Sequence, residues 1–119
     1  MSTRSNIGKL NPDGTITAIY CHWDGYPDHH LPILENHYDT PEKVDALLAL
    51  GNLSYLAPEI NESNPFGQAN PKYCCAYGRD RGDKDQEART YSGVDDKNFY
   101  YNDFSYLFVD GQGWTCTEN

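Results

Sequence analysis

The sequence predicts an α+β fold over residues 1–119, with an antiparallel sheet and two short helices packed on one face. Three observations lead to this prediction: a turn motif between two apolar segments near the start, two helical patterns in the middle, and another pair of apolar segments at the end. Strands that flank a block of helices, rather than alternating with them, are typical of this class. A chain of 119 residues is long enough for one hydrophobic core and too short for two.

A β-hairpin is predicted near the N-terminus. Residues 4–10 and 16–23 flank the sequence NPDGT, in which Pro12 presets the backbone of the turn and Gly14 takes a positive φ angle. Apolar side chains fall on both alternating faces of the second segment. A strand that buries both faces lies inside a sheet, so residues 16–23 are predicted to be central.

A first helix is predicted after this hairpin. Leu31, Leu34 and Tyr38 share one side of it, as the helical period requires. Because proline is tolerated in the first turn of a helix, Pro32 places the predicted start near residues 29–30.

The second helix has clearer boundaries. Thr40 is a favourable N-cap, Pro41 suits the first helical position, and Gly51 ends the helix. Its buried side is predicted to consist of Val44, Leu47 and Leu48.

The second half of the chain is predicted to hold one long loop and several strands. Residues 56–71 are rich in Pro, Asn, Glu and Ser, which predicts irregular structure. Residues 73–77 are predicted to form a third strand, and GRDRGDKDQE a solvated charged turn or loop before another strand at residues 89–91. Residues 104–109 and 114–117, joined through DGQG, predict a terminal hairpin.

The chain is strongly acidic, with 18 acidic against 9 basic residues and a formal charge of -9. Binding to nucleic acid needs a basic surface, so direct nucleic-acid binding is not expected. Acidic composition is common among soluble domains, but it also suits a surface that presents phosphate-like charge to a basic partner. The C-terminal region contributes strongly, since residues 95–119 hold Asp95, Asp96, Asp103, Asp110 and Glu118 against Lys97.

The cysteines and the apolar runs indicate the compartment. No signal peptide precedes Arg4, and no apolar run approaches the roughly 18 residues of a membrane span, so we expect a cytoplasmic protein with no membrane partner. Thiols are kept reduced in the cytosol, so the cysteines are predicted to be reduced and mostly buried. They are Cys21, Cys74, Cys75 and Cys116.

The stretch IYCHWDGYP, residues 19–27, brings chemically capable side chains to the end of a predicted strand. IYCHW predicts the strand and DGYP the turn that ends it. Aromatic side chains at such a position can stack on a base, which contributes about 1–3 kcal/mol per base, and nearby arginines can bind phosphate. The candidate ligand-binding residues are therefore Arg4, Ser5, Asn6, His22, Trp23, Asp24, Tyr26, Arg79 and Arg81.

A structural interpretation of the same residues stays open. Trp23 can be a core anchor and Asp24 a turn former, while Arg79 and Arg81 can belong to a solvated run of ion pairs. The strand pattern favours burial of Trp23, and its place before the turn favours exposure, so we expect a half-buried indole.

No catalytic residue, metal or cofactor is predicted. Zinc sites usually show C-x2-C or H-x3-H spacing, which is absent, and adjacent strand residues such as Cys21 and His22 point to opposite faces. No nucleophile, base and oxyanion donor stand out together, which favours binding over catalysis. The side chains capable of ligating a metal are Cys21, His22, Asp24, His29, His30 and His37.

Several segments together resemble a family of small proteins encoded by bacteriophages and related mobile elements. This resemblance implies no particular activity. It implies that the protein is the product of a phage accessory gene and acts in the host cytosol, and such genes often counter host defence. Residues 28–32, DHHLP, depart from the family pattern, which has smaller residues there, and this affects the shape of any pocket nearby. The matching blocks are residues 3–8 (TRSNIG), 13–15, 19–27 (IYCHWDGYP), 37–38 (HY), 77–82 and 106–114.

Two hypotheses about function follow. The first is an anti-defence protein that sequesters a small nucleotide-type signal, as a homo-oligomer. The second is an acidic inhibitor whose C-terminal region, including DDKNFYYNDFSY, docks on the basic nucleic-acid-binding surface of a host defence protein. A small enzyme or a metal-binding protein is the third alternative.

Overall fold

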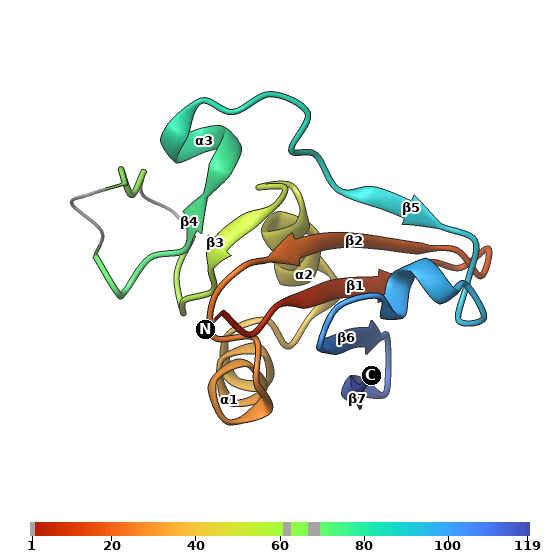
Figure 1. Cartoon of the computed structure of the whole chain (residues 1–119). Helices are drawn as coiled ribbons and strands as arrows, with labels where there is room; N and C mark the ends of the chain where they lie inside the picture. Colours follow the sequence, from red (N-terminus) through yellow and green to blue (C-terminus); the bar gives the residue numbers. More distant parts are fainter. Residues whose placement is uncertain (1, 61–62, 67–69) are drawn as a thin grey trace.

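A mixed β-sheet runs through the centre of the protein (Figure 1). The structure is a computed structural model that describes residues 2–60, 63–66 and 70–119. Within them the strand order is β4-β3-β2-β1-β6-β7, and β5 pairs with β2. The strands are β1 (Ser5–Leu10), β2 (Ile16–Cys21), β3 (Leu53–Tyr55), β4 (Cys75–Ala76), β5 (Arg89–Tyr91), β6 (Phe104–Val109) and β7 (Gly113–Glu118).

The α+β class is confirmed, but the prediction of a purely antiparallel sheet was wrong. β1 pairs with β2 and β6 with β7 as antiparallel hairpins, whereas β1 runs parallel to β6 and β2 parallel to β3. Parallel neighbours need a long crossover, and the helices between β2 and β3 supply one. Such pairings join segments far apart in the chain, so no local turn motif indicates them.

The two predicted hairpins are confirmed. In the first turn, the Asn11 amide donates to the Thr15 carbonyl at 2.8 Å, and the Asp13 carboxylate accepts from the Thr15 amide at 3.0 Å. Gly14 has a φ of +92°, which a residue without a Cβ adopts at no steric cost. β2 buries side chains on both faces, as its pattern predicted.

Helix α1 (Pro27–His37) begins earlier than predicted. Helix α2 (Pro41–Leu48) has the predicted start and buried side, but its C-cap is Ala49, two residues before the predicted end at Gly51. Pro27 occupies the first turn of α1, so Pro32 lies inside the helix, where it leaves one backbone acceptor without its helical donor. The Thr40 hydroxyl caps α2 by accepting from the Lys43 amide at 3.3 Å. No helix of the described residues is long and apolar enough to span a membrane.

The region between α2 and β6 differs most from expectation. The predicted strand at 73–77 is reduced to β4, and a helix, α3 (Tyr77–Arg81), replaces the first part of the predicted charged loop. A 3-10 helix, η1 (Lys97–Tyr100), was not predicted, whereas β5 confirms the strand at 89–91. The predicted loop at 56–71 includes residues 61–62 and 67–69, which lie outside the described residues.

The two faces of the sheet are covered unequally. Helices α1 and α2 cover one face, where the larger core gathers around residues such as Ile7, Leu34 and Leu47. On the other face a small cluster forms where Phe99 of η1 packs on Ile16 and Ala18. The rest of that second face, which we call the open face, is bordered by β5 and by the segment around η1 (Figure 1).

Candidate functional site

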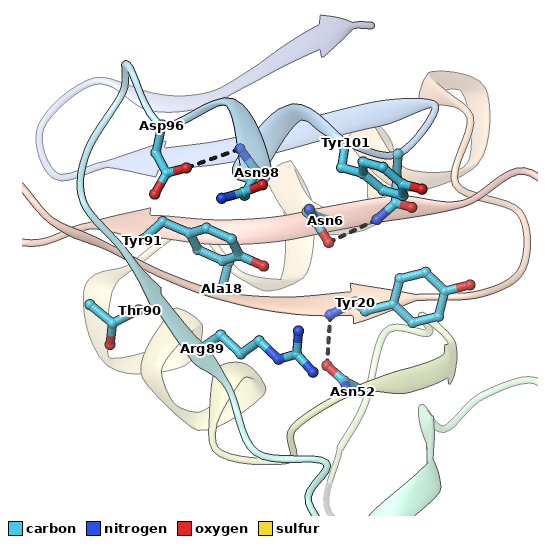
Figure 2. Close-up of a pocket in the computed structure, with 11 residues that line it drawn as sticks. Asn6, Ala18, Tyr20, Asn52, Arg89, Thr90, Tyr91, Asp96, Asn98 and Tyr101 are labelled. Atoms are coloured by element: carbon cyan, nitrogen blue, oxygen red, sulfur yellow. Dashed lines mark hydrogen bonds between the residues drawn. The ribbon is translucent and has the colours of Figure 1, made fainter.

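A groove of about 560 Å³ lies on the open face of the sheet (Figure 2). Strands β1 and β2 form its floor, β5 forms one side, and η1 with the residues after it forms the other. Its lining is mostly polar and aromatic: Asn6, Ala18, Tyr20, Asn52, Arg89, Thr90, Tyr91, Asp96, Asn98, Tyr101 and Asn102.

Carboxamide side chains set the shape of the floor. Asn6 is buried, and its amide donates to the Phe99 carbonyl at 2.9 Å, which ties η1 to β1. The Asn6 side-chain oxygen accepts from the Asn102 amide at 3.1 Å. Asn52 accepts from the Tyr20 backbone amide at 2.9 Å. These hydrogen bonds hold the floor rigid before any ligand arrives, which lowers the entropic cost of binding.

Tyrosines stand around the floor. Tyr101 is 86% exposed, an unusual state for a large aromatic side chain in so small a protein. Tyr91 is half-buried and touches the ring of Phe99 edge-on, with 5.8 Å between the ring centroids. Tyr20 is also half-buried, and its hydroxyl lies 2.6 Å from Nδ1 of His22. Burial raises the pKa of the Tyr20 phenol, so the ring is neutral at physiological pH.

Arg89 is the cation of the groove. It reaches from β5 toward the middle of the groove (Figure 2), and its guanidinium makes no ion pair or hydrogen bond within the described part of the chain. Most other cations are engaged, because carboxylates lie 2.6–3.5 Å from Lys9, Lys43, Lys72, Arg79 and Arg81. A guanidinium left without a partner in a polar groove can bind a planar anion.

The nine predicted ligand-binding residues do not come together in one place. Asn6 lies in the groove, and Arg4 lines a second hollow directly beside it. His22 is not among the lining residues, but its Nδ1 lies 2.6 Å from the hydroxyl of Tyr20, which is. Ser5 is buried on the helical face of the sheet, with its hydroxyl 3.1 Å from Nε2 of His30.

The turn after β2 is exposed but separate from the groove. Trp23 is 45% exposed, in agreement with the half-buried indole expected, and its ring meets His22 edge-on at 4.7 Å. Asp24 has a φ of +57°, consistent with a turn former. Tyr26 is exposed at the start of α1.

The two arginines of α3 serve the structure around them. Arg79 donates to the Ile60 carbonyl at 2.6 Å and to the Cys74 carbonyl at 3.0 Å. Arg81 pairs with Asp83 at 2.6 Å and stacks on the rings of Phe66 and Tyr77, with its guanidinium carbon 4.9 and 4.7 Å from their centroids. Both guanidinium groups are therefore committed to folding this region.

Three of the four cysteines belong to the core. Cys21 is fully buried, and burial raises the pKa of its thiol strongly, so it is not a thiolate at physiological pH. All four cysteines are free, and Cys74 and Cys75 are also buried. Within residues 2–60, 63–66 and 70–119, no three His, Cys, Asp or Glu side chains are placed to hold a metal ion.

Several residues of the groove were not predicted from the sequence. Tyr20 could have been found, because the alternation of side chains along β2 places it on the face opposite Ile19 and Cys21, which is the face that holds the groove. The others come from segments whose approach depends on long-range pairing: Asn52 before β3, Arg89 and Tyr91 on β5, and Tyr101 and Asn102 after η1.

Comparison of this chain with protein-family models, with curated proteins and with solved structures finds no match.

Proposed function

We propose that this protein is a small binding protein whose open-face groove takes up a nucleotide-type ligand, an anion with a flat base. One observation carries the proposal: Arg89, whose guanidinium has no partner among the described residues, lies in one groove with three tyrosines and several carboxamides. The resemblance to bacteriophage and mobile-element proteins supports the corresponding context, in which the protein removes a signal of host defence from solution.

Each part of the groove suits one part of such a ligand. Arg89 matches a phosphate, since charge-assisted hydrogen bonds to a guanidinium are both strong and directional. The exposed ring of Tyr101 suits stacking on a base, which contributes about 1–3 kcal/mol. The carboxamide of Asn98, exposed and free of side-chain hydrogen bonds within the described residues, can recognise a base edge.

The negative charge of the protein strengthens the argument that Arg89 marks an anion-binding site. A protein with a net charge of -9 repels anions at long range, so an anion binds only where local contacts outweigh the repulsion. Added salt screens both the attraction of Arg89 and the repulsion by the rest of the protein. Binding of a nucleotide is therefore expected to depend only weakly on ionic strength.

Calorimetry and thermal-shift measurements with a panel of mono- and dinucleotides test the proposal. Arg89→Gln and Tyr101→Ala should each weaken binding at least about tenfold without a large loss of stability, because neither side chain is buried. Lys84→Gln is the matched control: it removes the same charge from an exposed side chain outside the groove. The proposal fails if no nucleotide binds, or if the control variant weakens binding as much as Arg89→Gln does.

The acidic C-terminal region supports an alternative, an inhibitor that docks on a basic protein surface. Asp95, Asp110 and Glu118 are exposed there, and their carboxylates accept no hydrogen bond within the described residues. Binding through such charges should weaken steeply between about 0.05 and 0.3 M salt, unlike nucleotide binding. The salt dependence of complex formation with a captured host protein therefore distinguishes the two functions.

A further inference from the structure

We propose that the ligand spans two adjoining hollows of the open face and carries two separate phosphates, one at Arg89 and one at Arg4, as in a dinucleotide. This inference rests on the proposed function and narrows its ligand class. It follows from the shape of the surface, the distribution of unpaired cations, and the side chains that lie between them.

The groove continues into a second hollow of about 570 Å³. Tyr101 and Asn102 line both, so the two hollows meet at these residues. Each volume lies within the usual range for small-molecule sites. A ligand confined to one hollow would leave the other open, whereas an elongated ligand fills both and covers Tyr101. The remaining lining of the second hollow is Ser2, Arg4 and Asp103.

The cations that have no ion pair are placed to match this extension. Within the described residues they are Arg4, Lys84, Arg89 and Lys97, and the first hollow holds Arg89 while the second holds Arg4. Two guanidinium groups on either side of one exposed aromatic ring are the complement of two phosphates that flank a base.

The boundary between the hollows has its own binding groups. The Asn102 amide donates to Asn6, and the Asn102 backbone carbonyl accepts from the Asn119 side chain at 2.7 Å, so this residue is held from two directions. The Asn102 side-chain oxygen accepts no hydrogen bond within the described residues, so it is free to receive one from a base. Tyr101, immediately before it, supplies the flat apolar surface.

Asp103 makes the second hollow selective about charge. Its carboxylate accepts from the Arg4 backbone amide at 3.0 Å and therefore stands near the place where a phosphate would meet the Arg4 side chain. A carboxylate there opposes a doubly charged terminal phosphate more than a singly charged phosphodiester. The second hollow thus favours the phosphodiester of a dinucleotide over a terminal phosphate.

Titration calorimetry with cyclic dinucleotides and with 5′-mononucleotides of adenine, guanine and uracil tests this inference. The best cyclic dinucleotide should bind at least about tenfold more tightly than its mononucleotide. Arg4→Gln should remove that advantage and leave mononucleotide binding unchanged, while Arg89→Gln weakens both. Asp103→Asn, which keeps an acceptor for the Arg4 amide, should strengthen dinucleotide binding, and Lys84→Gln should have no effect.

The outcomes distinguish the inference of a ligand with two phosphates from the proposed function as a nucleotide-binding protein. Equal affinity for both ligand classes, or an Arg4→Gln variant that binds the dinucleotide as the unmodified protein does, overturns the two-phosphate inference and leaves the groove as a mononucleotide site. If neither cyclic dinucleotides nor mononucleotides bind, the proposed function itself is contradicted. Neither arginine side chain makes a hydrogen bond within the described residues, so both variants should keep the fold. Thermal melts of each variant check this.

Discussion

Individual side chains near the start of α1 show how the protein buries polar groups without leaving them unpaired. His30 is completely buried, with Nε2 next to the Ser5 hydroxyl and Nδ1 3.0 Å from Nδ1 of His29. The Tyr106 hydroxyl donates to the Gly25 carbonyl in the same region. Among the described residues, every buried side-chain nitrogen and oxygen has a hydrogen-bond partner, which avoids the cost of an unpaired polar group in the core.

Acidification should destabilise the protein through His30. Burial, assisted by the neighbouring His29, lowers the pKa of His30 from 6.5 to about 3. Between pH 6.5 and 3, His30 is therefore protonated in the unfolded chain but neutral in the folded protein. The contribution of His30 to stability is fully present above pH 6.5 and is lost as the pH falls toward 3. We expect the free energy of unfolding to drop by about 2 kcal/mol between pH 7 and pH 5, as measured by urea denaturation.

Two histidine variants identify the source of this pH dependence. His30→Gln should flatten the slope of the unfolding free energy against pH, whatever its effect on absolute stability. His37→Gln, at an exposed position in the last turn of the same helix, should leave the slope unchanged. A slope that persists in His30→Gln would assign the acid sensitivity to other groups.

The two tryptophans should respond differently to truncation. Trp23 is 45% exposed and does not pack on either core cluster of the described residues, so Trp23→Ala should cost no more than about 1 kcal/mol. Trp114 packs on Phe108, with 5.3 Å between ring centroids, and its indole donates to the Tyr38 carbonyl at 2.8 Å. Trp114→Ala should therefore cost about 3 kcal/mol. Thermal denaturation of both variants checks this; similar losses would contradict the exposed position of Trp23.

At the scale of elements, two short helices depend on contacts outside themselves. The Asp80 carboxylate in α3 accepts from the backbone amides of Ala76 and Asn64, at 2.7 and 2.8 Å, and so joins β4 to the preceding loop. These hydrogen bonds and Arg79 lower the pKa of Asp80 against the opposing effect of burial. η1 is tied to the sheet through Phe99, whose carbonyl accepts from Asn6 and from the Ser105 hydroxyl.

The docking of η1 should depend on Gly8. A Cβ at this position would lie 2.9 Å from side-chain atoms of both Ile16 and Phe99, so Gly8→Ala must push η1 away from β1 and β2. We expect a loss of about 1–3 kcal/mol, as for other overpacked sites, together with weaker ligand binding because η1 forms one side of the groove.

A matched glycine serves as the control for this variant. A Cβ at Gly78, in α3, would meet no atom closer than 3.8 Å. Gly78→Ala should therefore be neutral or slightly stabilising and should leave binding unchanged. Chemical denaturation and nucleotide titration of the two variants compare them directly. Equal behaviour would show that η1 does not need the close approach that Gly8 permits.

At the scale of the whole molecule, negative charge opposes compactness. The net charge of -9 is spread over a chain with a radius of gyration of 13.1 Å, while most of the cations are already paired. Repulsion among the remaining carboxylates raises the free energy of the folded state at low ionic strength. Salt screens this repulsion because many of the charges lie within a few Debye lengths of one another.

Moderate salt should therefore stabilise the protein. We expect the melting temperature to rise by a few degrees between about 0.01 and 0.2 M sodium chloride at neutral pH. Glu35 and Lys84 are exposed and without ion pairs in the described part of the chain, so they offer opposite charge changes. Glu35→Gln should reduce the gain and Lys84→Glu should enlarge it. A melting temperature that falls with salt would show that attractive ion pairs dominate instead.

The sequence by itself determined the elements whose signals are local. The turn at Pro12 and Gly14, the cap at Thr40 and the burial of Val44, Leu47 and Leu48 follow from backbone preferences and hydrophobic period, which act over a few residues. The central position of β2 followed from its two apolar faces in the same way. The start of α1 was misplaced because Pro32 was assigned to a first turn that Pro27 occupies.

Only the tertiary structure decided the strand order and the groove. The parallel pairing of β1 with β6 brings Asn102 to Asn6, and the pairing of β5 with β2 brings Arg89 over the floor, across separations that no local pattern encodes. The arginines differ in what decides their ion pairs. Arg79 and Arg81 pair with Asp80 and Asp83, their near neighbours in the sequence, as the charged run allowed. Arg4 and Arg89 line open hollows only because long-range strand pairing places β1 beside β6 and β5 beside β2.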